Sequence, residues 1–383
     1  MKIVIAPDSF KESLSALAVA EEIEAGFREI FPHADYCKLP VADGGEGTVQ
    51  AMIDATGGEL RTLAVVGPLG STVKASYGYA AARALAVIEM AAASGLELVP
   101  PAQRNPLITT SYGTGELIRD ALQSGARQLI IGIGGSATND AGAGMLQALG
   151  VRLLDDSGHE LEAGGAALAR LAHIDISALD PRIRACKIEV ACDVSNPLVG
   201  PTGASAVFGP QKGATPQMVA TLDAALRRFA EVLQRELGQD VAALAGAGAA
   251  GGMGAALLAV LGGRLRPGSE VVTEAVGLDE QLRDADLVIT GEGRIDGQTI
   301  YGKTPMGVAR VAARHGVPVI GLGGCLAPDA SAVHGEGIAA VFSSVRRACS
   351  VEEALRDARF NIRSLARNIA ATLQIGQKLR ADI

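Results

Sequence analysis

The sequence predicts an α/β protein in which a doubly wound parallel sheet is interrupted by a second, mixed-sheet α/β domain. Three observations support this prediction. A strand–helix rhythm opens the chain and returns after residue 286. Between these two parts, short strand candidates are linked by turns. Three loops rich in glycine and acidic residues each follow a short apolar run that is typical of a buried strand.

The first part of the chain has a β-α-β-α pattern. Lys2–Ala6 is an apolar strand candidate, and a helix with Ser13 or Ser15 as its N-cap follows, with apolar residues at 3–4 spacing. Tyr36–Leu39 is a second strand candidate, and Glu46–Ala55 is a second helix candidate, ended by two glycines. Alternating strands and helices imply parallel strands with helices on the faces of the sheet.

The middle of the chain favours antiparallel or mixed strand pairing, because its first strand candidates are joined by short turns. A long amphipathic helix is expected over Pro216–Leu237. The uncharged stretch Val241–Gly263 is long enough to cross a bilayer, but its alanine and glycine content favours a buried glycine-rich turn and a core helix near Gly254–Leu261. The strand candidates of this part are Leu60–Val66, Val73–Ala80, Leu85–Met90, Gln128–Ile133, Val151–Leu154 and Ile188–Cys192.

The β-α rhythm resumes near Asp286. Three C-terminal strands added to the two N-terminal ones make five parallel strands, the number in a flavodoxin-like doubly wound sheet. We therefore expect a flavodoxin-like domain of residues 1–66 plus 285–383, split by an inserted domain of residues 67–284. The strands expected here are Leu287–Thr290, Pro318–Leu322 and Ile338–Phe342, and the helices are Met306–His315, Asp329–Val333 and Val351–Leu373.

Composition narrows the class of protein. The 383 residues exceed one ordinary core, so two domains are expected. A formal charge of −8 argues against a nucleic-acid or anionic-membrane partner. The 5 cysteines form no C-x-x-C pair, and Met1–Ala6 is too short for a secretory signal, so we expect reduced thiols in a cytoplasmic protein.

Polar residues follow three neighbouring strands of the expected parallel sheet. Ligands bind at the carboxyl edge of such sheets, so these loops should meet around one small polar substrate. Carboxylates there can hold Mg²⁺ or take a proton, and glycine amides and lysines can approach a phosphate. Helix capping by Asp8 or a turn at Asp43 is the competing structural interpretation. The residues are Asp8, Ser9 and Lys11, then Asp43, Gly44 and Gly45, then Gly291, Glu292, Asp296 and Lys303.

Two glycine motifs point to nucleotides. Gly297–Thr304 fits the written phosphate-loop pattern, but we interpret the match as coincidental because the strand is expected to end near Thr290 and a proline follows. Gly132–Ala137 fits the dinucleotide fingerprint, so an NAD-dependent oxidoreductase is an alternative. A hydroxyl and acid cluster at Ser136, Thr138, Asn139 and Asp140 suits an Mg-nucleotide better. A non-catalytic metabolite-binding protein is the second alternative.

Eight motifs in order resemble the bacterial glycerate kinases. They include Pro40–Thr48, Gly134–Asp140, Asp193–Leu198 and Phe208–Gly213, and the resemblance runs through the whole chain. It implies ATP-dependent phosphorylation of D-glycerate to 2-phosphoglycerate and a flavodoxin-like domain with an inserted α/β domain. Ala141 departs from the family pattern, which often has glycine there.

The resulting hypothesis is in-line phosphoryl transfer from MgATP to the C2 hydroxyl of glycerate, in a cleft between the two domains. Glycerate, ATP and Mg²⁺ are the expected ligands, and a homodimer is left open. The expected catalytic residues are Lys11, Asp43, Asp193 and Asp296. Substrate binding is expected at Asp8, Ser9, Lys11, Gly44, Gly45 and Lys212. ATP binding is expected at Gly134, Gly135, Ser136, Thr138, Asn139, Asp140, Gly291, Glu292 and Lys303, and metal binding at Asp43, Asp193 and Glu292.

Overall fold

The computed structural model describes residues 1–381, and the chain divides into two compact units. The first unit contains Met1–Asp43, Gln50–Gly57 and the chain from Gly268 onward. The second unit contains Gly44–Val49 and Gly58–Pro267. The sequence prediction placed the two main boundaries at residues 66 and 284. Residues 44–49 and 58–66, which it assigned to the first domain, lie in the second unit, and residues 268–284, which it assigned to the inserted domain, lie in the first unit.

The first unit contains a five-stranded sheet in which every neighbouring pair is parallel. Its order is β13-β12-β11-β1-β2, which is the 2-1-3-4-5 order of a flavodoxin-like sheet. The expected fold class is thereby confirmed for this sheet. Its strands are β1 (Lys2–Pro7), β2 (Asp35–Lys38), β11 (Leu287–Ile295), β12 (Val319–Leu326) and β13 (Ala340–Ser343).

Strand β11 is longer than the sequence predicts. The apolar run ends near Thr290, but backbone pairing with β12 continues, with Glu292 opposite Gly323 and Arg294 opposite Cys325. The expected strand end at Thr290 is therefore wrong, because ladder hydrogen bonds carry the strand on through polar residues. Glu292 consequently lies in a strand and not in a loop.

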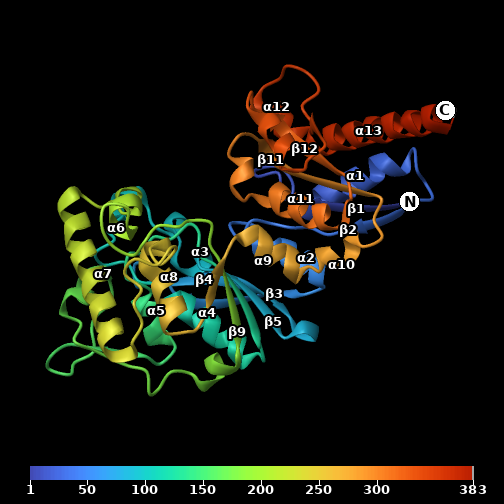
Figure 1. Cartoon of the computed structure of the whole chain (residues 1–383). Helices are drawn as coiled ribbons and strands as arrows, with labels where there is room; N and C mark the ends of the chain where they lie inside the picture. Colours follow the sequence, from blue (N-terminus) through green and yellow to red (C-terminus); the bar gives the residue numbers. More distant parts are fainter. Residues whose placement is uncertain (382–383) are drawn as a thin grey trace. The chain divides into compact units, whose positions relative to one another are not determined.

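Helices cover both faces of this sheet. Ile3 and Ile5 of β1 point to the face covered by α1 (Ala16–Arg28) and α13 (Ala358–Ala381), which lie side by side in Figure 1. Ser15 caps α1 by accepting a hydrogen bond from the backbone of Ala18. The remaining helices are α2 (Thr48–Thr56), which spans the unit boundary, α9 (Gly268–Ala275), α10 (Leu278–Leu282), α11 (Thr304–His315) and α12 (Val351–Arg356).

Two helix predictions in this unit need correction. The single helix expected over 351–373 is two helices, since α12 ends at Arg356 and α13 begins at Ala358. The segment expected as a helix near 329–333 is a 3-10 helix, Ala330–Glu336. The first difference concerns helix ends, where capping and local backbone turns decide the boundary and apolar spacing does not. The second concerns the type of a short helix, which a run of a few residues does not determine.

The second unit contains a six-stranded mixed sheet of order β10-β9-β6-β5-β4-β3. The pairs from β10 to β5 are parallel and the two pairs involving β4 are antiparallel, which confirms the expected mixed pairing. Strands β10 and β8 are short and were not predicted. The sheet consists of β3 (Glu59–Val66), β4 (Thr72–Ala80), β5 (Leu85–Glu89), β6 (Gln128–Gly132), β9 (Lys187–Ala191) and β10 (Arg264–Arg266), and a separate antiparallel pair is formed by β7 (Arg152–Leu154) and β8 (His173–Asp175).

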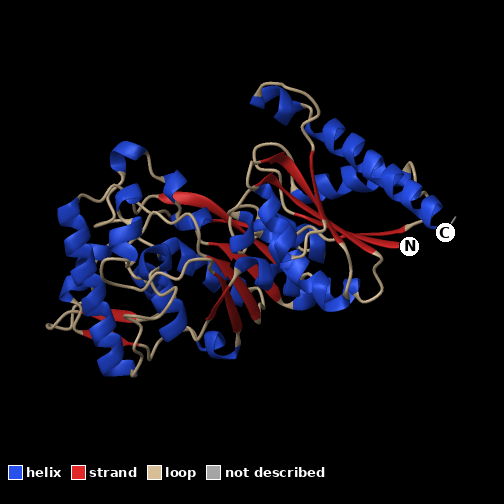
Figure 2. Cartoon of the chain, turned by 45° about the horizontal axis from the view of Figure 1, so that its top comes forward, coloured by secondary structure: helices blue, strands red, loops and turns tan. Residues whose placement is uncertain are grey.

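Helices flank this sheet, as the secondary-structure colours of Figure 2 show, and one core cluster joins them to it. The glycine-rich stretch near residue 250 is buried in that core, as expected. No helix among the described residues is both long and apolar enough to span a membrane. The helices are α3 (Ala91–Ser94), α4 (Tyr112–Gln123), α5 (Ala143–Ala148), α6 (Ala204–Phe208), α7 (Pro216–Leu237) and α8 (Ala249–Ala259).

Candidate functional site

Within the second unit, the loop that begins at Gly44 and the first turn of α2 are held in place by Glu89, the last residue of β5. The backbone N–H of Val49 donates to Glu89 Oε1 at 2.8 Å. Burial raises the pKa of Glu89, and the hydrogen bond from Val49 opposes that shift. A Cβ on Gly132 would lie 2.3 Å from the carbonyl oxygen of Gly44, so this approach requires glycine. Sequence reasoning missed Glu89, although an acid that ends an apolar strand is a usable signal.

A cavity of ≈520 Å³ lies beside this loop in the second unit. Glycines provide much of its wall, so backbone amides can come close to a ligand. Five residues predicted to bind substrate or ATP line it: Gly44, Gly45, Gly134, Gly135 and Ser136. The rest of the wall consists of Glu46, Glu89, Ala91, Ala92, Gly95, Leu96, Glu97, Gly132 and Gln211.

Four other predicted residues lie buried behind Ser136. Asp140 accepts hydrogen bonds from the backbone and hydroxyl of Ser111 at 2.9 and 2.8 Å. It also accepts from the backbone of two glycines that follow it. Burial raises the pKa of Asp140, and these donors oppose the shift. Thr138, Asn139, Asp140 and Lys212 are each at most 1% exposed, and none lines the cavity. The ligand contacts expected of them stay predictions.

The glycine-rich start of α8, where Ala250, Gly251 and Gly252 have non-helical φ and ψ angles, packs on this buried loop. The backbone of Ala141 donates to the carbonyl oxygen of Gly251 at 3.0 Å. A Cβ on Gly251, whose φ is +66°, would lie 2.1 Å from the carbonyl oxygen of Thr138. Ala141 itself has a φ of 53°, a left-handed conformation that costs an alanine roughly 1 kcal/mol. The segment therefore supports the shape of the Ser136–Asp140 loop.

Asp193, expected to be a metal ligand or a base, lies just beyond the end of β9 in the second unit and is exposed. It is not one of the residues that line the cavity. Its expected role stays a prediction.

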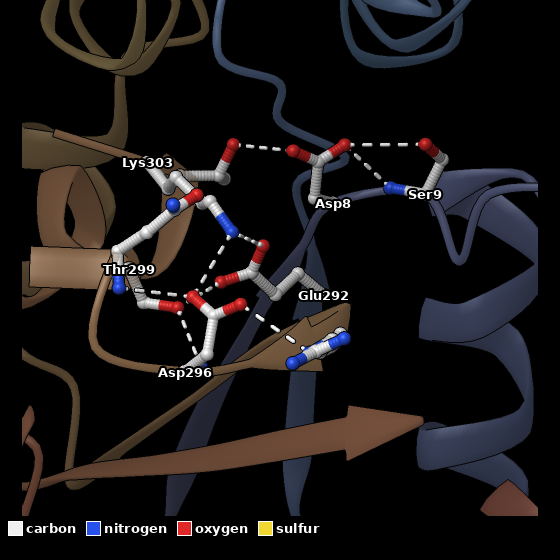
Figure 3. A network of polar contacts seen from close by, with 9 residues as sticks. Asp8, Ser9, Glu292, Asp296, Thr299 and Lys303 are labelled. Atoms are coloured by element: carbon white, nitrogen blue, oxygen red, sulfur yellow. Dashed lines mark hydrogen bonds and ion pairs between the residues drawn. The ribbon is translucent and has the colours of Figure 1, made fainter. Parts of the chain in front are cut away.

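In the first unit, Asp8 directly follows β1 and is buried. Its carboxylate accepts hydrogen bonds from the backbone of Ser9 at 2.6 Å and from the Thr304 hydroxyl at 2.5 Å (Figure 3). Burial raises the pKa of Asp8 to about 7, and the charges of Asp43 and Glu292 add to the shift, while the hydrogen bonds oppose it. Asp8 is thus a carboxyl that can hold or release a proton near neutral pH.

A second group in this unit contains Lys303 and two acids. Lys303 Nζ lies 3.3 Å from Glu292 and 3.6 Å from Asp296 (Figure 3). The Thr299 hydroxyl donates to Glu292 at 2.7 Å. Burial raises the pKa of Glu292, and Thr299 and Lys303 counteract it. The arrangement brings together three residues that the sequence placed in one loop.

Because β11 is longer than expected, it ends next to the residues that fit the phosphate-loop pattern. Because β11 reaches Ile295 and α11 begins at Thr304, residues 296–303 do connect a strand to a helix. Even so, the Thr304 hydroxyl is taken by Asp8, and Lys303 is paired with carboxylates. The pattern therefore lies between a strand and a helix, as a phosphate loop would, which the sequence did not predict. The side chains of Lys303 and Thr304, however, already have partners within the protein.

The other predicted residues of the first unit lie at the same strand ends. Lys11 is exposed in the turn after β1, and Ser9 and Asp43 are half-buried. Gly291 lies within β11, where its carbonyl oxygen accepts the backbone N–H of Asp8 at 2.8 Å. A Cβ on Gly291 would lie 2.2 Å from the carbonyl oxygen of Leu322, so this glycine permits close strand packing.

The chain is similar over nearly its whole length to proteins of one enzyme family. The model of the glycerate kinase family matches residues 3–374. The chain is 60% identical over 378 residues to a glycerate 2-kinase from Escherichia coli (strain K12), with 99% of both chains covered. It is 58% identical over 379 residues to a glycerate kinase from Bacillus subtilis (strain 168), again with 99% of both covered. A crystal structure of a glycerate kinase 2 from Salmonella typhimurium LT2 is similar with a TM-score of 0.93 and 62% identity, covering 99% of each chain.

Proposed function

The chain belongs to the glycerate kinase family, and we propose that it transfers a phosphoryl group from ATP to the C2 hydroxyl of D-glycerate. The observation that carries this proposal is the 60% identity to a glycerate 2-kinase over 99% of both chains. The expected product is 2-phosphoglycerate. The oxidoreductase and non-catalytic alternatives lose their support, because the family and the named relatives are kinases.

The cavity of the second unit is the proposed nucleotide site. Its ≈520 Å³ lies within the range of pockets for drug-sized ligands. Gly134 and Gly135 follow β6 at the carboxyl end of parallel strands, where open α/β sheets bind ligands. Ala91, Ala92 and Leu96 offer an apolar wall to a base.

The strand ends of the first unit are the proposed site for charge neutralisation and proton transfer. Asp8 and Ser9 would bind the glycerate hydroxyls, and Asp43 or Asp296 would orient the attacking C2 hydroxyl and take its proton. Lys11 and Lys303 would neutralise the substrate carboxylate or the transferred phosphate. Lys303 is held by Glu292 and Asp296, so its ammonium is positioned before the ligand arrives.

Mg²⁺ fits the acids of the first unit. The charges of Asp43 and Glu292 raise the pKa of Asp8, and a cation would relieve this repulsion. Among the residues that the structure describes, no group of three or more metal-ligating side chains gathers in one place. That pattern suits Mg²⁺ in a kinase, which is held by one or two carboxylates and by substrate phosphates. Asp43 and Glu292 would hold the ion, and it would neutralise the charge of the nucleotide phosphates. The metal-binding role expected of Asp193 stays a prediction.

The test is a product assay on the purified chain with ATP and D-glycerate. ADP release must depend on glycerate. Enolase converts 2-phosphoglycerate directly, whereas 3-phosphoglycerate requires phosphoglycerate mutase first. We expect a signal with enolase alone; a signal only after mutase is added would overturn C2 phosphorylation, and no ADP release would overturn the kinase assignment.

A further inference from the structure

Lys212 lies where a lysine is costly to place. It is 1% exposed, at the end of the short 3-10 helix Pro210–Lys212. Gly213 turns the chain immediately after it with a φ of +90°, and a Cβ there would lie 2.5 Å from the carbonyl oxygen of Arg104. Its neighbour Gln211 lines the cavity, whereas Lys212 itself is buried and does not.

The ammonium of Lys212 contacts two uncharged oxygen atoms. Nζ donates to the hydroxyl oxygen of Ser136 at 2.7 Å and to the carbonyl oxygen of Thr138 at 2.6 Å. Burial lowers the pKa of Lys212 to about 7, and the charge of Asp140 acts against that shift. Two neutral acceptors compensate only part of the free energy that is lost when an ammonium leaves water. A further anion would complete the compensation.

The contact with Lys212 determines what the Ser136 hydroxyl can do. A hydroxyl has one hydrogen to donate and two lone pairs. The protonated lysine is a donor only, so in that form its N–H occupies a lone pair of Ser136 and the hydroxyl hydrogen must point elsewhere. Ser136 lines the cavity, so that hydrogen is available to a ligand there. A cation behind the hydroxyl makes it a stronger donor.

The cavity needs such a donor if it is to hold an anion. Three glutamates line it, and the described lining residues include no lysine or arginine. An anionic ligand would therefore meet repulsion from the wall unless positive charge acts from behind it. Lys212 supplies that charge through a single side chain, Ser136.

We propose that Ser136 donates a hydrogen bond to a phosphate oxygen of the nucleotide, and that Lys212 is the positioning residue that orients this hydroxyl and supplies the charge behind it. The proposal rests on the kinase function proposed above and deepens it. It changes the expectation for Lys212 from a substrate contact to a residue that acts through Ser136. A nucleotide is favoured over glycerate because the cavity of ≈520 Å³ is large for a three-carbon acid.

The experiment measures kcat and KM for ATP and for glycerate in the full chain carrying Ser136→Ala, Lys212→Met or both. Each single substitution should raise the KM for ATP by about tenfold to a hundredfold, the range of a charge-assisted hydrogen bond. The KM for glycerate should stay within about twofold of wild type. The double variant should be no worse than Ser136→Ala, because Lys212 acts through the Ser136 hydroxyl and has nothing left to orient once that hydroxyl is removed. Lys74→Met, an exposed lysine on β4 in the same unit, is the matched control and should leave both constants unchanged.

Several results would overturn the proposal. An unchanged KM for ATP in Ser136→Ala would do so, and this variant decides the question if Lys212→Met fails to fold. A rise in the KM for glycerate alone would assign the hydroxyl to the other substrate. If the effects of the two substitutions on the KM for ATP were additive, Lys212 would not act through Ser136. If wild-type protein itself releases no ADP with glycerate, the proposed function fails, and equilibrium binding of an ATP analogue to the same variants still tests Ser136 and Lys212.

Discussion

Replacement of Asp8 by asparagine should make the first unit more stable at neutral and alkaline pH. The folded carboxyl has its pKa raised from 3.8 to about 7, chiefly by burial. A shift of about three units corresponds to about 4 kcal/mol of free energy that opposes folding once the unfolded chain is ionised. Asparagine carries no charge but loses part of the hydrogen bonding to Ser9 and Thr304, which costs about 1–3 kcal/mol. The net gain should be about 1–3 kcal/mol at about pH 8.

The sign of the pH dependence follows from a raised folded pKa. Between 3.8 and about 7 the folded carboxyl keeps a proton that the unfolded carboxyl has released. Stability of the wild-type chain therefore falls as pH rises through this window, and the penalty is complete above it. From about pH 6 to about pH 8 the advantage of Asp8→Asn should grow by about 1–2 kcal/mol.

Two measurements check this prediction. Urea unfolding of both proteins at about pH 6 and about pH 8 gives the change in free energy of unfolding. Amide hydrogen exchange in β1 and β11 reports on the first unit alone, because unfolding of a chain with two units need not be two-state. Asp156→Asn, an exposed aspartate, is the control and should show no pH-dependent difference. The conclusion that burial of the Asp8 carboxylate destabilises the protein would be refuted by either of two results: a stability difference between variant and wild type that is the same at both pH values, or a variant that is less stable than wild type at the higher pH.

Three further predictions test packing and loop support. Glu22→Ala should lower the free energy of unfolding by about 1–3 kcal/mol in urea titrations, because two half-exposed arginines on α13 lose the buried carboxylate that they share; an unchanged value would contradict this. Glu89→Ala should raise the KM for ATP by about tenfold, since the loop it holds is freed, and Glu89→Gln should restore most of the affinity by keeping the acceptor. Gly251→Ala should lower the free energy of unfolding by more than about 3 kcal/mol, or prevent folding, because the new Cβ would clash with the carbonyl oxygen of Thr138. Gly262→Ala is the control for thermal unfolding: Gly262 is also left-handed but has open space around it, so this change should cost only about 1 kcal/mol.

The sequence alone predicted the classes of both sheets correctly. Apolar runs such as Lys2–Ala6 and Leu85–Met90 are local signals, and the strand–helix rhythm at the start of the chain and after residue 286 implies parallel pairing in the first unit. The motif order also pointed to the family that the comparisons show. These features could be read in advance because each depends on residues that are close in sequence.

The tertiary structure decided how the site residues are used. Glu292 proved to lie in a strand, because pairing with β12 extends β11 beyond its apolar run. Lys212 reaches Ser136 across 76 positions, and Asp140 accepts hydrogen bonds from Ser111 and from the turn that follows it. The ligand contacts expected of these two residues stay predictions. Burial and hydrogen-bond partners depend on segments that are far apart in the chain. The presence of a lysine in the sequence therefore does not show whether its side chain contacts a substrate or supports another residue that does.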